Sequence, residues 1–341
     1  MNMDAAIMLI VLFYTVFGVN IAILLGMRKY KSDGSDASRT KVQIATSAGN
    51  NTRYVVGRRY ELMAPPHKQG GMATIWLASE RKTGRKYIIK TPRRGTNMDN
   101  VYLDKLMLEA GYLKMLKHDG IVKYLNDFYS DGEFHLVIEY LDGETLMAAS
   151  PRSPFKEPQV IAWAAQLLDA LSYVHAAGIV HRDVNPKNIM LCRDDTVKLI
   201  DFGTAKKLND DDDKDEASRD PFTQITNKGF DIPELFSGDD SDGRSDLCGL
   251  AQTCIYLLTL KHPNEICRNL FKSSWPRSYS EAATVADYLV SCDISKRVAK
   301  CLAQCIMYSP DNRFANAGAF QAALSSADGY PMKPVEVTPK K

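Results

Sequence analysis

The chain changes character along its length, from short segments typical of β-strands to longer segments typical of α-helices. Residues 73–78, 86–90 and 134–139 are rich in β-branched and aromatic residues, which predicts strands. Beyond about residue 146, apolar residues recur mainly at the spacing of a helix. The clearest helical patterns anywhere in the chain cover residues 103–116, 158–175, 246–260 and 294–307. We therefore expect an α+β fold with a small β-rich lobe followed by a larger helical lobe.

An apolar run, Ala5–Met27, stands near the start of the chain and is broken only by Tyr14, Thr15 and Asn20. A helix of this length, at ~1.5 Å per residue, spans about 35 Å, enough to cross the hydrocarbon core of a bilayer. We predict a transmembrane helix over residues 5–27. A cleaved signal peptide is the alternative; it is disfavoured because the run is too long and no Lys or Arg precedes it.

The charges around this run predict its orientation. Residues 28–31, Arg-Lys-Tyr-Lys, follow it directly, so the positive-inside rule places the N-terminus outside and the rest of the chain in the cytoplasm as a single-pass membrane protein. The partner of residues 5–27 is then the lipid bilayer. Gly18, Ala22 and Gly26 recur every four residues, which would allow close pairing with another membrane helix or a homodimer.

The remaining segments predict the domain organisation. Residues 28–52 are rich in Ser, Thr, Gly and Asp and predict a flexible linker. The folded domain is expected over residues 53–328, with lobes of about 53–140 and 141–328. Residues 329–341 contain three prolines and three lysines and predict a disordered tail.

Overall charge and cysteine usage exclude several classes of function. The chain has 43 basic and 41 acidic residues, so it carries no general electrostatic footprint for nucleic acid, and we expect no nucleic-acid partner. All seven cysteines lie from Cys192 onward, without CxxC pairs or zinc-ligand spacing. They are typical of reduced thiols in a cytosolic domain.

Two short motifs give the strongest chemical signal. Residues 181–188 read His-Arg-Asp-Val-Asn-Pro-Lys-Asn, and thirteen residues after Asn188 stands Asp201-Phe-Gly. Here the chain closely resembles the eukaryotic-like (Hanks-type) Ser/Thr protein kinase family, whose catalytic loop reads HRDxxxxN and whose metal-binding motif reads DFG. The resemblance covers about residues 59–325 and implies a bilobal protein-kinase-like fold, here in a membrane-anchored member.

The resemblance implies transfer of phosphate from ATP to Ser or Thr hydroxyls of protein substrates. Asp183 would orient the hydroxyl, and Asn188 and Asp201 would offer oxygen ligands to Mg²⁺, with Mn²⁺ as an alternative. Lys90, at the end of a predicted strand, would bind the α- and β-phosphates. Glu109, on the helix that follows, would hold this lysine in place.

The expected nucleotide pocket departs from the family pattern at its phosphate-covering loop. Where the family reads GxGxxGxV, Lys68 and Ala73 replace two glycines, and Gly70 and Gly71 remain to bring backbone amides near the phosphates. The resemblance further implies that the adenine is bounded by Ile75, Ile88, Glu139, Leu141 and Met190.

A second departure lies in the catalytic loop, where Asn185 stands two residues after Asp183 in place of a lysine that steadies the transferred phosphate. Loss of one electrostatic stabiliser costs on the order of 10²–10³ in rate. Either activity is low or Lys187, offset by two, compensates and is catalytic. The alternative function is therefore a pseudokinase scaffold with weak or no phosphotransfer.

Two further features bear on the substrate class and on regulation. Glu234, in Ile-Pro-Glu, and Arg313 resemble the family's buried ion pair and favour a protein kinase over a small-molecule kinase of related fold. Arg182 resembles the arginine that binds a phosphate on the activation segment. We expect autophosphorylation at Thr223 or Thr226, which phosphopeptide mapping of the active protein tests.

Overall fold

The computed structural model describes residues 54–63, 66, 72–95, 97–150, 153–208, 229–237 and 241–325, with the backbone alone of 41–42, 53 and 68–69. The predicted transmembrane segment 5–27 and the tail 329–341 lie outside these residues. Within the described ranges, no helix is both long and apolar enough to cross a membrane. Lys41 and Val42 belong to the predicted linker 28–52 and pair with a strand of the domain.

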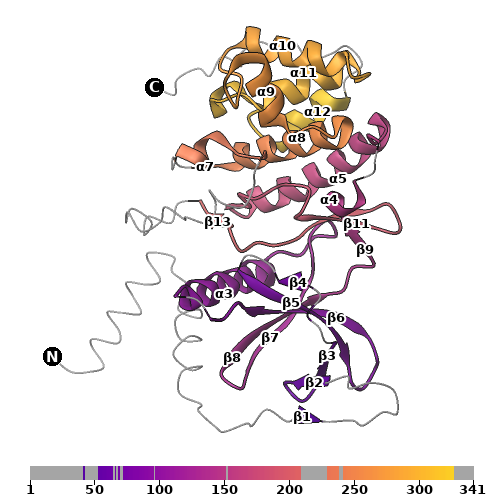
Figure 1. The fold of residues 1–341 in the computed structure, drawn as a ribbon, viewed down its shortest axis with the longest axis vertical. Coiled ribbons are helices and arrows are strands. Elements are labelled where there is room, and N and C mark those ends of the chain that lie inside the picture. The colour runs from indigo at the N-terminus through magenta and orange to yellow at the C-terminus, as the bar shows by residue number, and fades with distance from the viewer. Residues whose placement is uncertain are drawn as a thin grey trace, which may run out of the picture.

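An antiparallel sheet forms the N-terminal lobe, in the order β1-β2-β3-β5-β6-β8-β7, with β4 paired to β5. Figure 1 shows this sheet at one end of the molecule and the helices of the second lobe at the other. The strands are β1 (Lys41–Val42), β2 (Arg53–Val56), β3 (Tyr60–Leu62), β4 (Lys68–Gln69), β5 (Ala73–Glu80), β6 (Lys86–Pro92), β7 (Tyr124–Ser130) and β8 (Glu133–Glu139). The three predicted strands are confirmed as β5, β6 and β8.

One helix, α3 (Asp99–Met115), accompanies this sheet and packs against β6, β7 and β8. Its buried residues, among them Tyr102, Leu106, Glu109 and Leu113, recur three to four positions apart, as expected for one face of a helix. The predicted helix 103–116 is therefore confirmed, although it begins one turn earlier. This face turns Glu109 toward the sheet.

The C-terminal lobe is helical, as predicted. Its helices are α4 (Leu146–Ala149), α5 (Glu157–Ala176), α7 (Pro233–Ser237), α8 (Gly243–Thr259), α9 (Pro263–Phe271), α10 (Tyr279–Val290), α11 (Lys296–Cys305) and α12 (Ala317–Ser325), with a 3₁₀ turn at Pro310–Asn312. Short strands β9 (Gly143–Thr145), β11 (Ile189–Cys192) and β12 (Val197–Leu199) form a small sheet, and β10 (Ile179–Val180) pairs with β13 (Lys206–Lys207). Both small sheets lie where the lobes meet.

Helix α8 shows why one predicted boundary was wrong. The pattern of apolar residues placed its start at Asp246, but the helix begins at Gly243. Asp242 caps it, accepting a hydrogen bond from the backbone N–H of Arg244 at 2.8 Å. Because the first turn is made of polar residues and glycine, hydrophobic periodicity does not detect it. Asp246 consequently lies inside the helix, one turn from its start.

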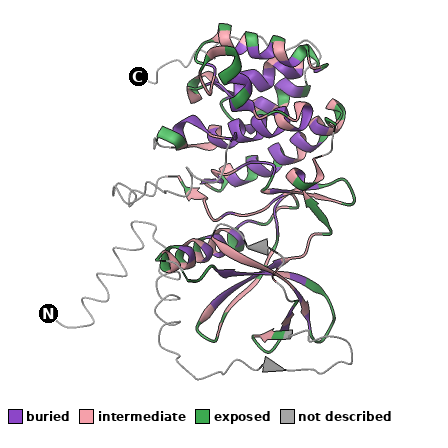
Figure 2. Ribbon diagram, in the orientation of Figure 1, coloured by how far each residue is buried: buried purple, intermediate pink, exposed green. Residues whose placement is uncertain are grey.

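A continuous hydrophobic core joins the two lobes. Figure 2 shows buried residues, in purple, in the first lobe as well as in the helices of the second. Leu113 of α3, Phe202, and Leu167 of α5 belong to the same cluster, and each is at most 1% exposed. A second, smaller cluster lies on the opposite face of the N-lobe sheet. It consists of Tyr60, Leu62, Ala78, Tyr87, Ile89 and Val137.

The predicted ion pair in the C-lobe is confirmed. Arg313 Nη1 and Nη2 donate to Glu234 Oε1 and Oε2 at 2.7 and 2.8 Å, and the two residues are 3% and 5% exposed. Ser245 Oγ donates to the same carboxylate at 2.5 Å, and Arg313 Nε donates to the carbonyl of Met307 at 2.8 Å. These bonds satisfy both buried charges and fix α7 against α8.

Candidate active site

Lys90 lies near the end of β6, where its strand pairs with Ile75 of β5 and Leu136 of β8. Its ammonium is 2.6 Å from Glu109 Oε1 on α3, and the two residues are 5% and 2% exposed. The distance to Asp201 Oδ1 is 3.5 Å. The structure thus brings together three residues that the sequence placed far apart, with the lysine between two carboxylates.

Charge and burial set the protonation of this triplet. Burial lowers the pKa of Lys90, but the carboxylates of Asp201 and Glu109 outweigh it and hold that pKa above its usual value. Burial raises the pKa of Glu109 to about 6, although Lys90 opposes the rise. Partial burial also raises the pKa of Asp201, but Lys90 and His181 bring it below its usual value. At neutral pH the site therefore holds one ammonium and two carboxylates.

Two backbone hydrogen bonds position Asp201. The loop that follows α3 lies beside β12, where Val122 N–H donates to Leu199 O at 3.0 Å and Leu199 N–H donates to Gly120 O at 2.8 Å. These bonds link the end of α3 to the strand that leads into Asp201. Phe202 is fully buried, with its ring 4.6 Å from that of His181 in an edge-on contact. The aspartate is therefore fixed relative to both lobes.

Asp246 of α8 binds the catalytic loop. From the sequence, only the start of a helix was predicted at this residue. Its carboxylate is fully buried and accepts hydrogen bonds from the backbone N–H groups of His181 and Arg182 at 2.9 and 2.7 Å. His175 Nε2 lies 2.8 Å from the same carboxylate. The signal available in the sequence was a carboxylate within an otherwise apolar helix, which requires buried partners.

A glycine lets α8 approach this loop closely. A Cβ built on Gly249 would lie 2.4 Å from the carbonyl oxygen of Val184. No side chain fits there, so the contact requires glycine. Arg182 has a φ of 67°, a left-handed conformation that the bond from its N–H to Asp246 supports.

The loop presents the side chain of Asp183 between two amides. Asn185 Nδ2 donates to Asp183 Oδ1 at 2.6 Å, and Asn188 Nδ2 donates to Asp183 Oδ2 at 2.7 Å. Lys187 has an exposed side chain, and its backbone N–H donates to Asn185 Oδ1 at 2.9 Å. Asp183, Asn185, Lys187 and Asn188 therefore lie together in one loop. Asn185 is hydrogen-bonded to Asp183 within it.

Asn188 and Asp201 fit the Mg²⁺ that the fold implies. Asn188 uses its Nδ2 toward Asp183, which leaves its amide oxygen as a ligand, and Asp201 adds a carboxylate whose side chain is 41% exposed. Hard oxygens of this kind suit Mg²⁺, which takes few protein ligands when phosphates supply the others. Within the described ranges, His, Cys, Asp and Glu form no cluster of three that could hold a metal by themselves.

The predicted adenine residues come from both lobes. Ile75 faces Lys90 across β5 and β6, and Ile88 lies two residues before Lys90 and so on the same face of β6. Met190 is on β11 in the C-lobe, and Leu141 follows β8 in the connection between the lobes. These four residues are partly buried. Apolar side chains from both lobes are thus placed where they suit a flat ring bound between the lobes.

Glu139 ends β8, and its groups are already engaged. Its carboxylate lies 2.9 Å from Lys198 Nζ and accepts from the backbone N–H of Lys123 at 2.9 Å, while its own N–H donates to the carbonyl of Lys123 at 3.0 Å. Its carboxylate and its N–H are therefore not the groups that would meet an adenine edge. Gly70 and Gly71 lie outside the described residues, although Met72, just after them, has its Cε near Gly203.

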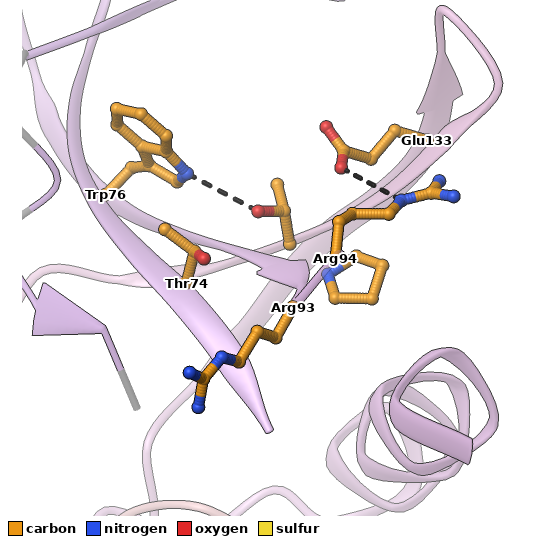
Figure 3. Close-up of a pocket in the computed structure, with 7 residues that line it drawn as sticks. Thr74, Trp76, Arg93, Arg94 and Glu133 are labelled. Carbon is orange, nitrogen blue, oxygen red and sulfur yellow. Dashed lines mark hydrogen bonds and ion pairs between the residues drawn. The ribbon is translucent and has the colours of Figure 1, made fainter. Parts of the chain in front are cut away.

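The pocket in Figure 3 is separate from these residues. It has a volume of about 380 Å³ and lies on the side of β5 and β6 opposite to Lys90, because neighbouring residues of a strand face opposite ways. Trp76 Nε1 donates to Thr91 Oγ1 at 3.4 Å, and Arg94 Nε lies 3.5 Å from Glu133 Oε1. It is lined by Thr74, Trp76, Thr91, Pro92, Arg93, Arg94 and Glu133, none of which is a predicted site residue.

Comparisons with known proteins agree with this geometry. The chain is 31% identical over 300 residues to a probable serine/threonine-protein kinase of Streptomyces coelicolor, covering 81% of this chain and 41% of the relative. It is 30% identical over 298 residues to serine/threonine-protein kinase D of Synechocystis, covering 82% and 56%. The chain therefore spans about half the length of these two relatives.

The same fold occurs in a crystal structure of the PknI kinase domain of Mycobacterium tuberculosis. The TM-score is 0.57 at 22% identity, and the likeness covers 82% of this chain and 98% of that one. A family model described as protein kinase domain matches residues 69–325, which include every site residue described above. This match covers most of the chain, and we conclude that the chain belongs to the protein kinase family.

Proposed function

We propose that this protein transfers the γ-phosphate of ATP to Ser or Thr hydroxyls of protein substrates. One observation carries the proposal: Lys90 is held between Glu109 and Asp201 at 2.6 and 3.5 Å. A buried lysine paired in this way is a fixed positive charge facing a site where phosphates bind. Relatives named serine/threonine-protein kinases support the choice of substrate hydroxyl.

The residues divide the reaction between them. Lys90 binds the α- and β-phosphates, while Glu109 keeps the ammonium in position. Asp183 accepts a hydrogen bond from the substrate hydroxyl and orients its oxygen toward the γ-phosphorus. The new P–O bond forms as the bond to the β-phosphate breaks, and the hydroxyl proton leaves by way of Asp183. Asn188 and Asp201 would hold Mg²⁺, which supplies charge neutralisation on the phosphates when bound.

The assay is incorporation of radiolabelled phosphate from ATP into a generic basic protein by the full chain, with Mg²⁺ or Mn²⁺. The product is then hydrolysed and its phosphoamino acids are separated. We expect phosphoserine and phosphothreonine. Phosphotyrosine as the main product would contradict the substrate class, and no incorporation with either ion would favour the pseudokinase scaffold.

The pseudokinase alternative has two observations in its favour, the absence of a lysine at position 185 and the replacement of two loop glycines by Lys68 and Ala73. It predicts that the chain binds nucleotide but transfers no phosphate. Against it, Lys90, Glu109 and Asp201 are in contact, and Asp183 and Asn188 are hydrogen-bonded to each other. A scaffold does not require this set of contacts.

We also propose that residues 5–27 anchor the protein in a membrane with the kinase domain in the cytoplasm. Arg28, Lys29 and Lys31 support this orientation. Labelling of each variant is compared with that of wild type, because the native Cys192 and Cys292 are partly exposed free thiols. In intact bacterial cells, a membrane-impermeant maleimide should label Asn2→Cys, and should label Ser35→Cys only after permeabilisation. Equal labelling of both variants, or recovery in the soluble fraction, would contradict the anchor.

Autophosphorylation remains part of the proposal. Arg182 is partly buried, and its Nε makes no hydrogen bond within the described ranges. A phosphate on the segment before Glu234 would supply an acceptor for this guanidinium. Thr223 and Thr226 lie outside the described residues. Phosphopeptide mapping of active protein that finds no modified site in residues 204–231 would count against the proposal.

A further inference from the structure

The carboxylate of Asp183 is fixed at both oxygens by carboxamides from its own loop. Asn185 Nδ2 donates to Oδ1 at 2.6 Å, and Asn188 Nδ2 donates to Oδ2 at 2.7 Å. Each amide also donates to the backbone carbonyl of Asp183, at 3.2 and 3.0 Å. Hydrogen bonds to charged acceptors are stronger than those between neutral groups, so the pair limits rotation of the carboxylate.

Both polar atoms of the Asn185 carboxamide, Nδ2 and Oδ1, form hydrogen bonds within the loop. It is 2% exposed, and its Oδ1 accepts from the backbone N–H of Lys187 at 2.9 Å. Reversing the amide would set oxygen against the Asp183 carboxylate and NH₂ against an N–H group. The network therefore fixes the orientation of the amide. The side chain has no charge to offer a phosphate.

We propose that Asn185 is a positioning residue that holds the Asp183 carboxylate in its reactive orientation for phosphoryl transfer. The inference rests on the proposed kinase function. In the family that the sequence resembles, the lysine at this position steadies the transferred phosphate. Asn185 provides a donor to the aspartate and leaves the charge on the transferred phosphate to the bound ion. A neutral amide thus occupies the position at which the family has a charged lysine.

Loss of the Asn185 amide should change kcat and the KM for ATP differently. Removing the amide leaves Lys90, Glu109 and Asp201 untouched, so nucleotide binding should not change. Asp183 loses the donor at one oxygen, so the chemical step should slow. For Asn185→Ala we expect kcat to fall on the order of 10²-fold, with the KM for ATP within about threefold of wild type.

A second variant tests the donor itself. Asn185→Lys restores a donor to Asp183 and adds a positive charge beside the transferred phosphate, although the Lys187 N–H loses its acceptor. We expect this variant to recover most of the rate that Asn185→Ala loses. A residue with only a structural role would give no such rescue, because lysine has no acceptor to replace the Asn185 oxygen that binds the Lys187 N–H.

The matched control is Gln304→Ala, since Gln304 is an amide that is also 2% exposed but lies on α11, away from the site. It should lower Tm and leave kcat unchanged. If Asn185→Ala does not fold, Asn185→Asp replaces it: this variant is the same size and lacks the NH₂ donor, so kcat should also fall.

The experiment measures kcat, the KM for ATP and Tm of the full chain and each variant, beside Asp183→Asn. An active wild type with Asn185→Ala at the same kcat overturns this inference alone. Equal losses in Asn185→Ala and Asn185→Lys, or a loss that appears in KM, also overturn it. A wild type no faster than Asp183→Asn overturns the proposed function and this inference together.

Discussion

At the scale of single residues, the chain relies on a lysine whose charge is maintained against burial. Lys90 is 5% exposed and keeps its ammonium because Asp201 and Glu109 lie beside it. An isolated buried ammonium would lose its proton instead. Strand β6 supplies the lysine and α3 supplies the glutamate, so the position of α3 decides whether the pair forms.

The first prediction removes the charge of Glu109 and keeps its size. Glu109→Gln should lower kcat/KM by on the order of 10², because Lys90 then pairs only with Asp201 and is no longer held at the phosphates. The measurement is steady-state kinetics with varied ATP. Glu133→Gln is the control: Glu133 pairs with Arg94 at 3.5 Å outside the site, and its loss should leave the kinetics unchanged. Equal activity of Glu109→Gln and wild type would contradict the role.

The second prediction concerns pH. Burial raises the pKa of Glu109 to about 6, so the carboxylate that anchors Lys90 is protonated as the pH falls through that value. We expect kcat/KM to decline below about pH 6 in wild type, and Glu109→Gln to lack this limb. The folded state binds this proton more tightly than the unfolded state, so protonation of Glu109 does not itself destabilise the fold. Activity should therefore fall before Tm does.

The motifs made most of the site predictable at this scale. Asp183, Asn188 and Asp201 lie in two short stretches whose residue types and spacing indicate phosphoryl transfer. The partners of Asn185 were not predictable, because the sequence shows only that a lysine is missing. Asp246 was not recognised either, since its three partners lie more than sixty residues earlier in the chain.

At the scale of elements, α8 supports the catalytic loop through Asp246 and through the close approach at Gly249. The periodic pattern predicted the helix itself, but its start was misplaced because the first turn contains no apolar residue. Periodicity reports which face is buried and says nothing about which buried residue is charged. The contact of Gly249 with Val184 is likewise visible only once helix and loop are placed together.

The third prediction uses this contact. Gly249→Ala places a Cβ 2.4 Å from the carbonyl of Val184 and should cost about 1–3 kcal/mol of stability, with loss of activity as the loop shifts. Gly111→Ala is the control, because nothing lies within 4 Å of a Cβ at this position of α3. It should stabilise the protein by about 0.5–1 kcal/mol. Urea unfolding measures both; a neutral Gly249→Ala would contradict the close contact.

At the scale of the whole molecule, both lobes and the order of strands before helices follow from patterns that local sequence carries. The way the lobes meet does not. It depends on Phe202 packing into a core shared with α3 and α5, and on backbone bonds between β12 and the loop after α3. These contacts join segments distant in sequence, and no local pattern encodes them.

The fourth prediction tests the buried ion pair that closes the C-lobe. Glu234→Ala should cost about 3–5 kcal/mol in unfolding free energy, because the guanidinium of Arg313 is left buried without its partner. Asp311→Ala removes an exposed partner of Arg244 and should change stability little. Thermal and urea unfolding of the two variants give the comparison. Similar stabilities would show that the buried pair does not support the fold.

The proposed function requires that this chain transfers phosphate and does not only bind nucleotide. The most direct measurement compares wild type with Asp183→Asn for the initial rate of phosphate transfer to a protein substrate, with the affinity for a fluorescent ATP analogue measured in parallel. We expect similar nucleotide affinities and a rate at least on the order of 10²-fold lower in the variant. Equal rates in the two proteins, or no transfer above background by either, would contradict it.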